Sequence, residues 1–430
     1  MARAALLAGL AAALAGCVEG MPFPSGRGPL SPATGTLSPP AERRADSSPV
    51  IAGLQARRSV LPPQGAYARI SSGVLAYSAG SAQAELRVKR LQAQAKSKNW
   101  LPQIGPSLSL SRLGDVAAQL VLDLVLFDNG AKRAEREYAV ADVELAAVSL
   151  SQEMNDLVAE GIGHYLDVQQ ANEQAQLARR AEARLGEYDR IMRLRVQGGL
   201  SDMSEARVLG QKLAEMQATA AADEDAAQTA SAQLAAMSAQ PPEGLSGLDA
   251  LEIPAALPEV LDLHRAEGLR DLSVAEARMA RAGLLPSLGA QASVGQGKPD
   301  VGLTLGLERM LGLGTGDQLA AFEAAEKAAE ARVEKARREA EREDAALTAR
   351  LDALIAKEAR GREVTAQTGQ SLEMFARQYK LGRRTLMELV TMYESYAAME
   401  RAQAALKYDI ARIKLEMARQ HGILVDGSSI

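Results

Sequence analysis

Four short stretches of the chain alternate apolar and polar residues, and they occur as two pairs nearly two hundred residues apart. The first pair lies at residues 101–111 and 119–127, and the second at residues 285–295 and 301–308. A period of two predicts β-strands, so each pair is expected to form a hairpin. Alternation over about ten residues suits a barrel strand with lipid on one side, and a soluble sheet is the alternative. In the last stretch one face holds Val301, Leu303, Leu305 and Leu307, and the other holds Gly302, Thr304, Gly306 and Glu308.

Each predicted hairpin is followed by a helical stretch of unusual length, from about residue 131 to 196 and from about residue 317 to 381. At 1.5 Å per residue such a helix spans roughly 90–100 Å. Residues 389–417 place apolar side chains at alternating steps of three and four, and Gln403 is the only polar member of this seam. The spacing predicts a coiled-coil partner. The fold is therefore expected to be mainly α, with long antiparallel coiled-coil helices and a small β part.

Both long helices are predicted to stop at a glycine and to be followed at once by another helix. Gly199 and Gly382 align between the two halves, and glycine suits the left-handed conformation that ends many helices. Ser201 and Thr385 are placed to cap the helices that follow. The two halves therefore form an internal duplication, in which a strand pair precedes a helical hairpin. The predicted tips consist of Gly199, Leu200 and Ser201 on the first hairpin and of Gly382, Arg383 and Arg384 on the second.

The N-terminal region has the pattern of a leader. An apolar run from Ala4 to Gly16 is too short to span a membrane as a mature helix but has the length of a signal-peptide core. It ends at Cys17, the only cysteine of the 430 residues, in a setting that resembles a bacterial lipobox. We therefore expect lipid attachment at Cys17, with an ordinary secretory signal and an incidental cysteine as the alternative. Val18 stands where an aspartate would usually signal retention in the inner membrane, which favours the outer membrane.

These patterns divide the chain into six segments. Prolines and glycines are frequent after the cysteine, which predicts a tether, and a second group of prolines marks the boundary between the repeats. The predicted segments are a lipoprotein signal peptide (1–16), a Pro/Gly-rich lipid-anchored tether (17–75), a first strand-pair and hairpin repeat (76–240), an inter-repeat linker (241–262), a second repeat (263–424) and a C-terminal tail (425–430).

Composition and charge narrow the function classes. The net charge of -5 and the pI near 5.6 give no electrostatic case for nucleic acid. One cysteine allows neither an internal disulfide nor a Cys-rich metal site, and His164, His264 and His421 lie far apart without a second ligand at metal spacing. Residues 312–316 are glycine-rich, but Asp317 stands where a nucleotide-binding loop requires glycine. We expect no metal, no cofactor and no catalytic site.

The order of these features resembles the TolC-type outer-membrane factor family from about residue 75 to 424. The resemblance rests on the strand exit Leu126-Phe127-Asp128-Asn129-Gly130, on the two glycine tips, and on the closing stretches 404–409 and 422–424. It implies a homotrimer in which each subunit gives four strands to one twelve-stranded barrel and paired helices to a periplasmic tunnel. The pattern itself agrees, because four strands are too few to close a membrane barrel. The second strand exit, residues 310–316, lacks the Phe-Asp-Asn-Gly form, and Phe127 is the only aromatic residue of the strands.

The same resemblance implies an outer-membrane exit duct that receives substrate from an inner-membrane pump through a periplasmic adaptor docked at the tips. It also implies a gate, since Glu388 matches the first of the family's acidic gate positions and Thr391 stands at the second. Three copies of Glu388 facing the lumen would favour cations, whereas a helix-surface position is the alternative. A periplasmic coiled-coil scaffold or adaptor lipoprotein is the rival function. The sequence leaves the substrate and the type of pump open.

Overall fold

The computed structural model describes residues 48–78, 80–112, 115–238, 244–295, 299–307 and 312–430. The predicted signal peptide and Cys17 lie outside these residues. The described part is predominantly helical, as predicted, with one small sheet. Its helices are α2 (Pro49–Gln55), α3 (Ala66–Ser78), α4 (Gly80–Lys96), α5 (Ala131–Gln197), α6 (Met203–Ala236), α7 (Leu261–Ala282), α8 (Thr315–Lys380) and α9 (Leu386–Gln420), with a 3-10 turn η2 (Gly427–Ser429).

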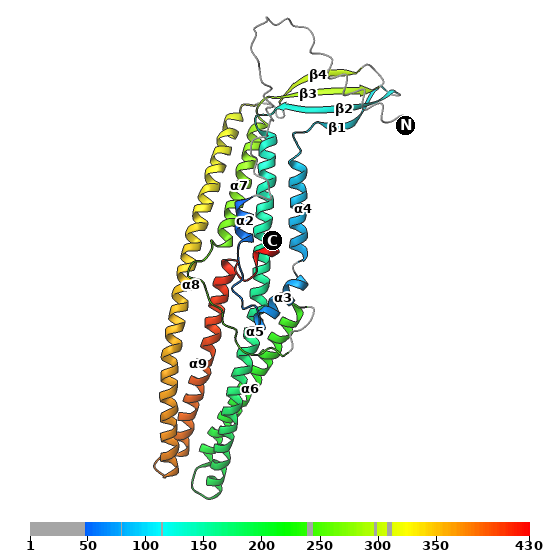
Figure 1. Cartoon of the computed structure of the whole chain (residues 1–430). Coiled ribbons are helices and arrows are strands. Elements are labelled where there is room, and N and C mark those ends of the chain that lie inside the picture. The colour runs from blue at the N-terminus through cyan, green and yellow to red at the C-terminus, as the bar shows by residue number, and fades with distance from the viewer. Residues whose placement is uncertain (1–47, 79, 113–114, 239–243, 296–298, 308–311) are drawn as a thin grey trace, which may run out of the picture. The chain divides into compact units, whose positions relative to one another are not determined.

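The two long helices of the prediction are α5 and α8, with 67 and 66 residues. Each turns back into a shorter helix, so α5 pairs with α6 and α8 pairs with α9 (Figure 1). The predicted seam of α9 packs in part against α8. Its polar member, Gln403, donates from Nε2 to the carbonyl of Glu358 at 2.9 Å and lies directly over Gly361, where a Cβ atom would collide with its amide. Gly361 therefore allows a polar side chain into the α8–α9 contact.

The four predicted strands form one antiparallel sheet in the order β1-β2-β3-β4 (Figure 1). The strands are β1 (Gln103–Arg112), β2 (Asp115–Phe127), β3 (Ser287–Gly295) and β4 (Asp300–Gly306). The hairpins β1-β2 and β3-β4 come from the two repeats, and the pairing of β2 with β3 joins them. The duplication predicted from the sequence is thus built into a single sheet.

The register gathers apolar residues on one face of this sheet, and polar residues, glycines and two valines on the other. One row runs Ile104, Leu122, Ala292 and Val301 across the four strands, and the next row continues with Leu124, Ala290 and Leu303. The opposite face carries the row Gln103, Asp123, Gln291 and Gly302, followed by Val125, Gly289 and Thr304. Every residue of β4 is exposed on both faces. No other described element covers either face. Within one subunit the sheet is therefore two-sided, with both its apolar and its polar face uncovered.

The strand exit singled out in the sequence forms a tight junction with α5. The Asp128 carboxylate accepts hydrogen bonds from the backbone N–H groups of Gly130 (3.1 Å) and Lys132 (2.6 Å), and so caps the first turn of α5. Asn129 adopts a left-handed conformation with φ of 52° and donates from Nδ2 to the carbonyl of Pro286 at 2.7 Å. In the second repeat Thr315 instead bonds to Gly312, at 2.8 and 3.0 Å. The two exits reach α5 and α8 by different local chemistry.

The folded body begins earlier than the predicted tether allowed. Helix α2 and most of α3 lie inside the segment assigned to the tether, residues 17–75. Ser48 caps α2 by accepting from the N–H of Val50, and the buried side chains of these helices pack into the main core with α5 and the end of α9. Proline at the first position of α2 is compatible with a helix start. The prediction gave more weight to the many prolines of this region than to its apolar residues. Five of these residues belong to the core: Ile51, Leu54, Tyr67, Ile70 and Val74.

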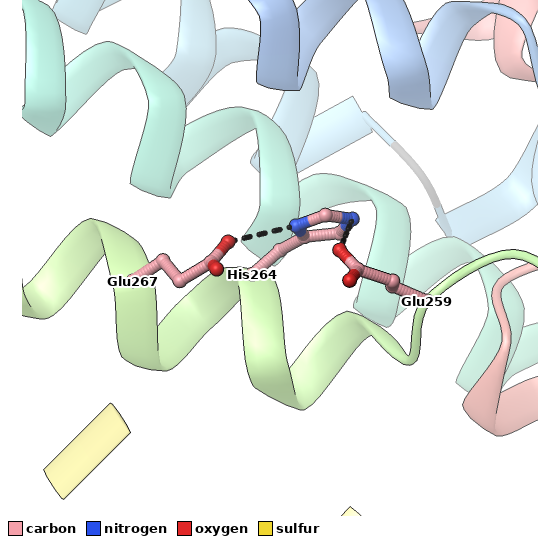
Figure 2. A group of neighbouring side chains, drawn as sticks. All are labelled: Glu259, His264 and Glu267. Atoms are coloured by element: carbon pink, nitrogen blue, oxygen red, sulfur yellow. Dashed lines mark hydrogen bonds and ion pairs between the residues drawn. The ribbon is translucent and has the colours of Figure 1, made fainter. Parts of the chain in front are cut away.

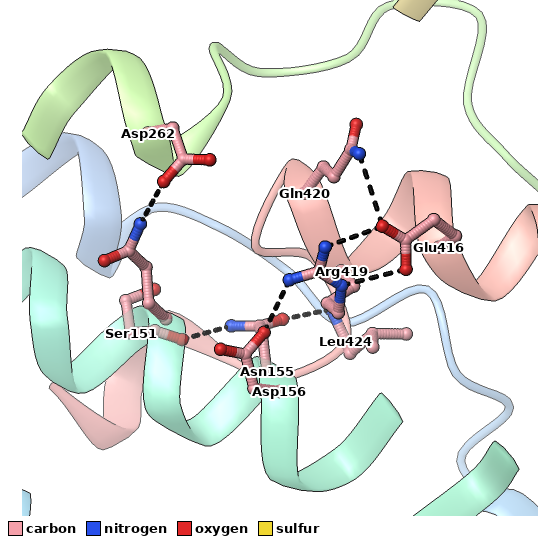
Figure 3. A network of polar contacts seen from close by, with 9 residues as sticks. Ser151, Asn155, Asp156, Asp262, Glu416, Arg419, Gln420 and Leu424 are labelled. Carbon is pink, nitrogen blue, oxygen red and sulfur yellow. Dashed lines mark hydrogen bonds and ion pairs between the residues drawn. The ribbon is translucent and has the colours of Figure 1, made fainter. Parts of the chain in front are cut away.

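A polar network ties the end of the second repeat to the first long helix (Figure 3). Arg419 of α9 donates to both carboxylate oxygens of Glu416 and reaches Asp156 of α5 at 2.7 Å. These carboxylates raise the pKa of Arg419, and the guanidinium lowers that of Glu416. Buried Asn155 accepts from the backbone N–H of Leu424 at 2.8 Å. The last residues of the chain are thus part of the core. Among the described helices none is both long enough and apolar enough to cross a membrane.

Candidate functional site

The first hairpin tip is closed by a glycine in the left-handed conformation. Gly199 has φ of 69°, and the following N–H, that of Leu200, donates back to the carbonyl of Arg195 at 2.8 Å. This is the usual hydrogen bond of a glycine-terminated helix. The Arg195 side chain crosses the turn and donates to the Ser201 hydroxyl at 3.0 Å. Leu200 is 70% exposed, so the tip presents an apolar side chain to solvent.

The cap of α6 lies one residue later than predicted. Asp202, not Ser201, is the capping residue, because its carboxylate accepts from the N–H of Ser204 at 3.1 Å. The Ser201 hydroxyl is occupied by Arg195 instead. The short side chains at both positions have capping chemistry, so the sequence alone did not distinguish them.

The second tip repeats this geometry with different side chains. Gly382 has φ of 71°, and the N–H of Arg383 donates to the carbonyl of Gln378 at 2.9 Å. A Cβ atom added at Gly199 or Gly382 would meet nothing within 4 Å. Backbone conformation, and not space within the subunit, therefore explains the glycine at each tip. The two glycines are equivalent, as the sequence alignment of the halves predicted.

Thr385 caps α9 as predicted and forms a capping box with Glu388. The Glu388 N–H donates to Thr385 Oγ1 at 3.2 Å, and the Thr385 N–H donates to Glu388 Oε2 at 2.8 Å. Arg384 adds an ion pair to Glu388 Oε1 at 2.8 Å and stacks over the Phe375 ring. The backbone hydrogen bond from Thr385, followed by that from Arg384, lowers the pKa of Glu388. Glu388 thus remains ionised and solvent-exposed, with a cation beside it.

Thr391 lies one helical turn beyond Glu388 on α9 and is exposed. The two predicted gate positions are therefore close neighbours on the helix. The sequence did not lead us to expect Arg384 as the partner of Glu388. The two residues are four positions apart, which is a spacing at which side chains near a helix start can pair. Lys212 was not expected either; it joins the two hairpins through an ion pair with Glu394 at 2.5 Å. No sequence signal connects Lys212 with Glu394, because they are far apart in the chain.

A shared apolar cluster holds the two hairpins together near their tips. Its buried members come from α5, α6 and α9, and half-buried residues of α8 pack around it. The Tyr188 and Tyr393 rings meet edge to face, with centroids 6.1 Å apart. The positions of the two tips are therefore coupled through packed side chains. The buried residues are Leu185, Tyr188, Met192, Leu209, Leu386, Leu389 and Val390.

Of the described residues, Glu259, His264 and Glu267 are close enough to be compared with a metal site. The two carboxylates lie at opposite ring nitrogens of His264: Glu267 is 3.2 Å from Nδ1, and Glu259 is 4.0 Å from Nε2 (Figure 2). A metal ion binds one ring nitrogen, so both carboxylates would have to approach the same side of the ring. Their arrangement on opposite sides of the ring does not fit a metal ion.

The comparisons with known proteins agree with this architecture. Residues 80–240 match the model of the outer membrane efflux protein family. This match covers the first repeat, 161 of the 430 residues. The match and the fold favour a transport channel over an enzyme. No curated protein sequence matches it significantly.

Solved structures share the fold over most of the chain at low sequence identity. A membrane protein from Pseudomonas aeruginosa has a TM-score of 0.74 at 17% identity, covering 94% of this chain and 98% of its own. VceC, an outer membrane protein from Vibrio cholerae, has a TM-score of 0.71 at 16% identity, covering 83% and 96%. The MtrE outer membrane channel of Neisseria gonorrhoeae, in its open state, has a TM-score of 0.68 at 19% identity, covering 90% of both chains. At these identities the likeness establishes the fold alone.

Proposed function

We propose that three copies of this chain form the exit duct of a tripartite efflux or type I secretion system. The observation that carries the proposal is the two-sided sheet. Its outer strands β1 and β4 each have one neighbour among the described strands, and one face is apolar while the other is polar. Such a sheet is unstable alone in lipid, because its edges leave backbone groups unpaired. Closing it with further copies satisfies both edges and places the polar face around a water-filled channel.

The first test is therefore assembly. The detergent-solubilised protein should migrate as a trimer that dissociates on heating, and it should form conducting pores in planar bilayers. A periplasmic scaffold or adaptor, which is the rival function, needs neither property. The structure favours the duct, because each of the two helical hairpins follows its own strand pair. An adaptor would usually contain one hairpin within soluble β-domains.

The tips are the proposed docking sites of the periplasmic adaptor, and α9 beyond the second tip is the proposed gate. The basic side chains Arg383 and Arg384 and the apolar Leu200 are exposed at the turns. The inner-membrane pump selects the substrate. The function proposed for this chain is therefore passive conduction alone.

Glu388→Gln should reduce the cation preference of single channels if Glu388 faces the lumen. Glutamine keeps the capping box, so the helix start should survive while the charge is lost. Arg384→Gln should act in the opposite direction, because it leaves the Glu388 carboxylate uncompensated. Reversal potentials in asymmetric salt measure both effects. Since the pKa of Glu388 is lowered, wild-type cation preference should persist below about pH 4.3, the ordinary carboxylate range.

The same two variants also show which results would contradict the proposed gate. If both channels keep the wild-type reversal potential, Glu388 and Arg384 decorate the outside of the helix and the gate lies elsewhere. If only Arg384→Gln changes it, the cation and not the carboxylate controls selectivity.

Cys17→Ser should abolish incorporation of labelled fatty acid, because the mature chain is proposed to start at Cys17 with lipid attached. Conduction by the purified trimer should be retained, since the proposed barrel holds the protein in the membrane by itself. Labelling with a radioactive or clickable fatty acid in growing cells measures the first effect, and bilayer recordings measure the second. Persistent labelling of the serine variant would show that the lipid is attached elsewhere, and a lack of labelling in the wild type would show that the leader is an ordinary one.

A further inference from the structure

Large apolar side chains are exposed at each of the four described junctions between the sheet and the helices. The junctions lie at one end of the sheet, because the strands are antiparallel and each hairpin has a helix before and after it (Figure 1). Single exposed apolar residues are common on protein surfaces, but a group of them marks an interaction surface. The six residues, which we call the junction rim, are Trp100, Leu101, Phe127, Leu285, Leu307 and Leu313.

The α4–β1 junction holds the single tryptophan of the chain in a fixed turn. Trp100 is 63% exposed, and the residue before it, Asn99, is bonded to the start of α5. Asn99 Nδ2 donates to the carbonyl of Lys132 at 3.0 Å and to Glu135 Oε2 at 2.7 Å. Asn99 Oδ1 accepts from Arg136 at 2.7 Å. These hydrogen bonds fix the turn relative to α5, so the position of Trp100 along the molecule is set by the fold.

A β-bulge places Phe127 on the apolar face of the sheet. The register of β2 and β3 shifts by one residue between Val125 and Phe127, so Phe127 pairs with Leu288. Leu288 in turn pairs with Leu305, and it lies two residues from Ala290 of the apolar row. Paired residues share a face of the sheet, and a bulge moves the side chain that follows it to the other face. The extra residue therefore adds an aromatic ring to the apolar face where that face meets the helices.

Two cations beside the junction rim have no ion-pair partner among the described residues. Lys98 precedes Trp100 by two residues, and Arg281 lies in the last turn of α7. Both side chains are exposed. Asp317, in the first turn of α8, is also exposed and carries the opposite charge. The unpaired positive charge is therefore concentrated at the α4–β1 and α7–β3 junctions.

A phospholipid headgroup layer matches both the apolar and the cationic side chains. Tryptophan favours membrane–water interfaces, because its ring is largely apolar while its N–H needs a polar partner. The phosphates of the same layer attract lysine and arginine, whose long stems can lie along apolar surface. The junction rim also continues the apolar face of the sheet, and beyond it α5 opens with the charged residues 132–137. The rim therefore lies at the boundary between an apolar and a charged surface.

We propose that the junction rim lies in the headgroup layer of the membrane leaflet that faces the helices. Trp100 and Phe127 anchor the channel at this depth, and Lys98 and Arg281 bind phospholipid phosphates. The proposal rests on the proposed function, since the apolar face of the sheet must contact lipid for the rim to reach a headgroup layer. It assigns to the strand–helix junctions the aromatic anchors that the strands themselves largely lack.

The intrinsic tryptophan fluorescence of the protein reports the depth of Trp100 alone, because the chain has no other tryptophan. The full-length protein is reconstituted in phosphatidylcholine vesicles whose acyl chains carry bromine either next to the headgroup or near the bilayer centre. We expect the shallow bromines to quench Trp100 at least about twofold more strongly than the deep ones, since the ring favours the interface. Stronger quenching by the deep bromines, or quenching by aqueous acrylamide without any by lipid, would refute the proposal. A ring shielded from lipid and water alike would lie between subunits, which also refutes it.

Two relocated tryptophans calibrate the depth and separate this proposal from the proposed function. In a Trp100→Phe background, Leu303→Trp in the middle of β4 should be quenched most by the deep bromines. Leu200→Trp at the first tip should be quenched by acrylamide and not by lipid. If the Leu303→Trp protein escapes quenching by lipid, the membrane barrel itself is refuted. If it is quenched by lipid while the wild-type protein is not, the barrel stands and only the position of the junction rim is wrong.

Charge reversal tests the two cations. Vesicles that contain phosphatidylglycerol should take up at least about twofold more wild-type protein than phosphatidylcholine vesicles do, because their surface is anionic. The double variant Lys98→Glu and Arg281→Glu should lose this preference, whereas Arg383→Glu at the second tip should keep it. If the double variant does not assemble in detergent, the two single reversals decide, and each should lose part of the preference. A preference that survives these reversals, or that is lost equally in Arg383→Glu, would refute phosphate binding at the junction rim.

Discussion

Leu303→Arg is expected to prevent assembly of the channel, whereas Thr304→Arg is expected to leave assembly intact. Leu303 is the central residue of β4, is 72% exposed, and lies in the apolar row with Leu124 and Ala290. If this row faces lipid, an arginine near the bilayer midplane costs about 2–4 kcal/mol in each subunit. The cost is incurred once per copy, so a trimer carries it three times.

Thr304 is the matched control, because it is the next residue on the same strand and its side chain points to the other face. It pairs with Gly289 and packs over that glycine, on the side that carries Asp123 and Gln291. An arginine there should enter the proposed lumen and lower the single-channel conductance. Heat-modifiable gel migration and membrane fractionation measure assembly. Equal tolerance of arginine at both positions would mean that neither face contacts lipid and that the sheet is not part of a membrane barrel.

Gly382→Phe is expected to abolish efflux in cells while the purified channel still conducts. Gly382 sits at the proposed adaptor contact with φ of 71° and no neighbour within 4 Å of an added Cβ atom. The phenyl group would therefore project outward into the docked partner, and not into its own subunit. We expect adaptor binding to weaken by at least about tenfold, since a clash at the centre of an interface is rarely accommodated.

Gly382→Asn separates this steric effect from backbone strain. Asparagine tolerates the left-handed conformation better than other residues, so the turn should form and efflux should be close to wild type. Drug-susceptibility assays, adaptor cross-linking and bilayer recordings on both variants provide the comparison. Normal adaptor cross-linking by Gly382→Phe would remove the second tip from the docking surface. Loss of conductance in the same variant would instead indicate damage to the fold.

Much of the fold could be predicted from the sequence because its signals are local and repeated. Alternation of period two located all four strands, and the glycines with their following caps located both turns. Gly199 and Gly382 were identifiable because a left-handed helix end favours glycine whatever surrounds it. Thr385 and Glu388 were spaced as a capping box, which spans only four consecutive residues of the chain.

The sequence did not identify the cap of a helix where two neighbouring residues could both act as the cap. Asp202 rather than Ser201 caps α6, because the arginine at 195 occupies the serine hydroxyl from the preceding helix. The predicted tether extended too far along the chain, because proline was also ambiguous as a signal. Prolines indicate where a helix starts as well as where it is absent, and only packing shows that Leu54 and Tyr67 are core residues.

By itself the sequence determined the four strands, the two long helical hairpins and their order, because each of these follows from interactions between residues within a few positions of one another. The tertiary structure alone decided which distant residues meet. The His421 ring contacts Pro258 and Asp344, and Asn155 bonds to Leu424. Such contacts arise when long helices pack side by side, and their registers depend on the whole core. His421 looked like any isolated histidine in the sequence, and only the packed structure buries its ring between the Pro258 carbonyl and the Asp344 carboxylate.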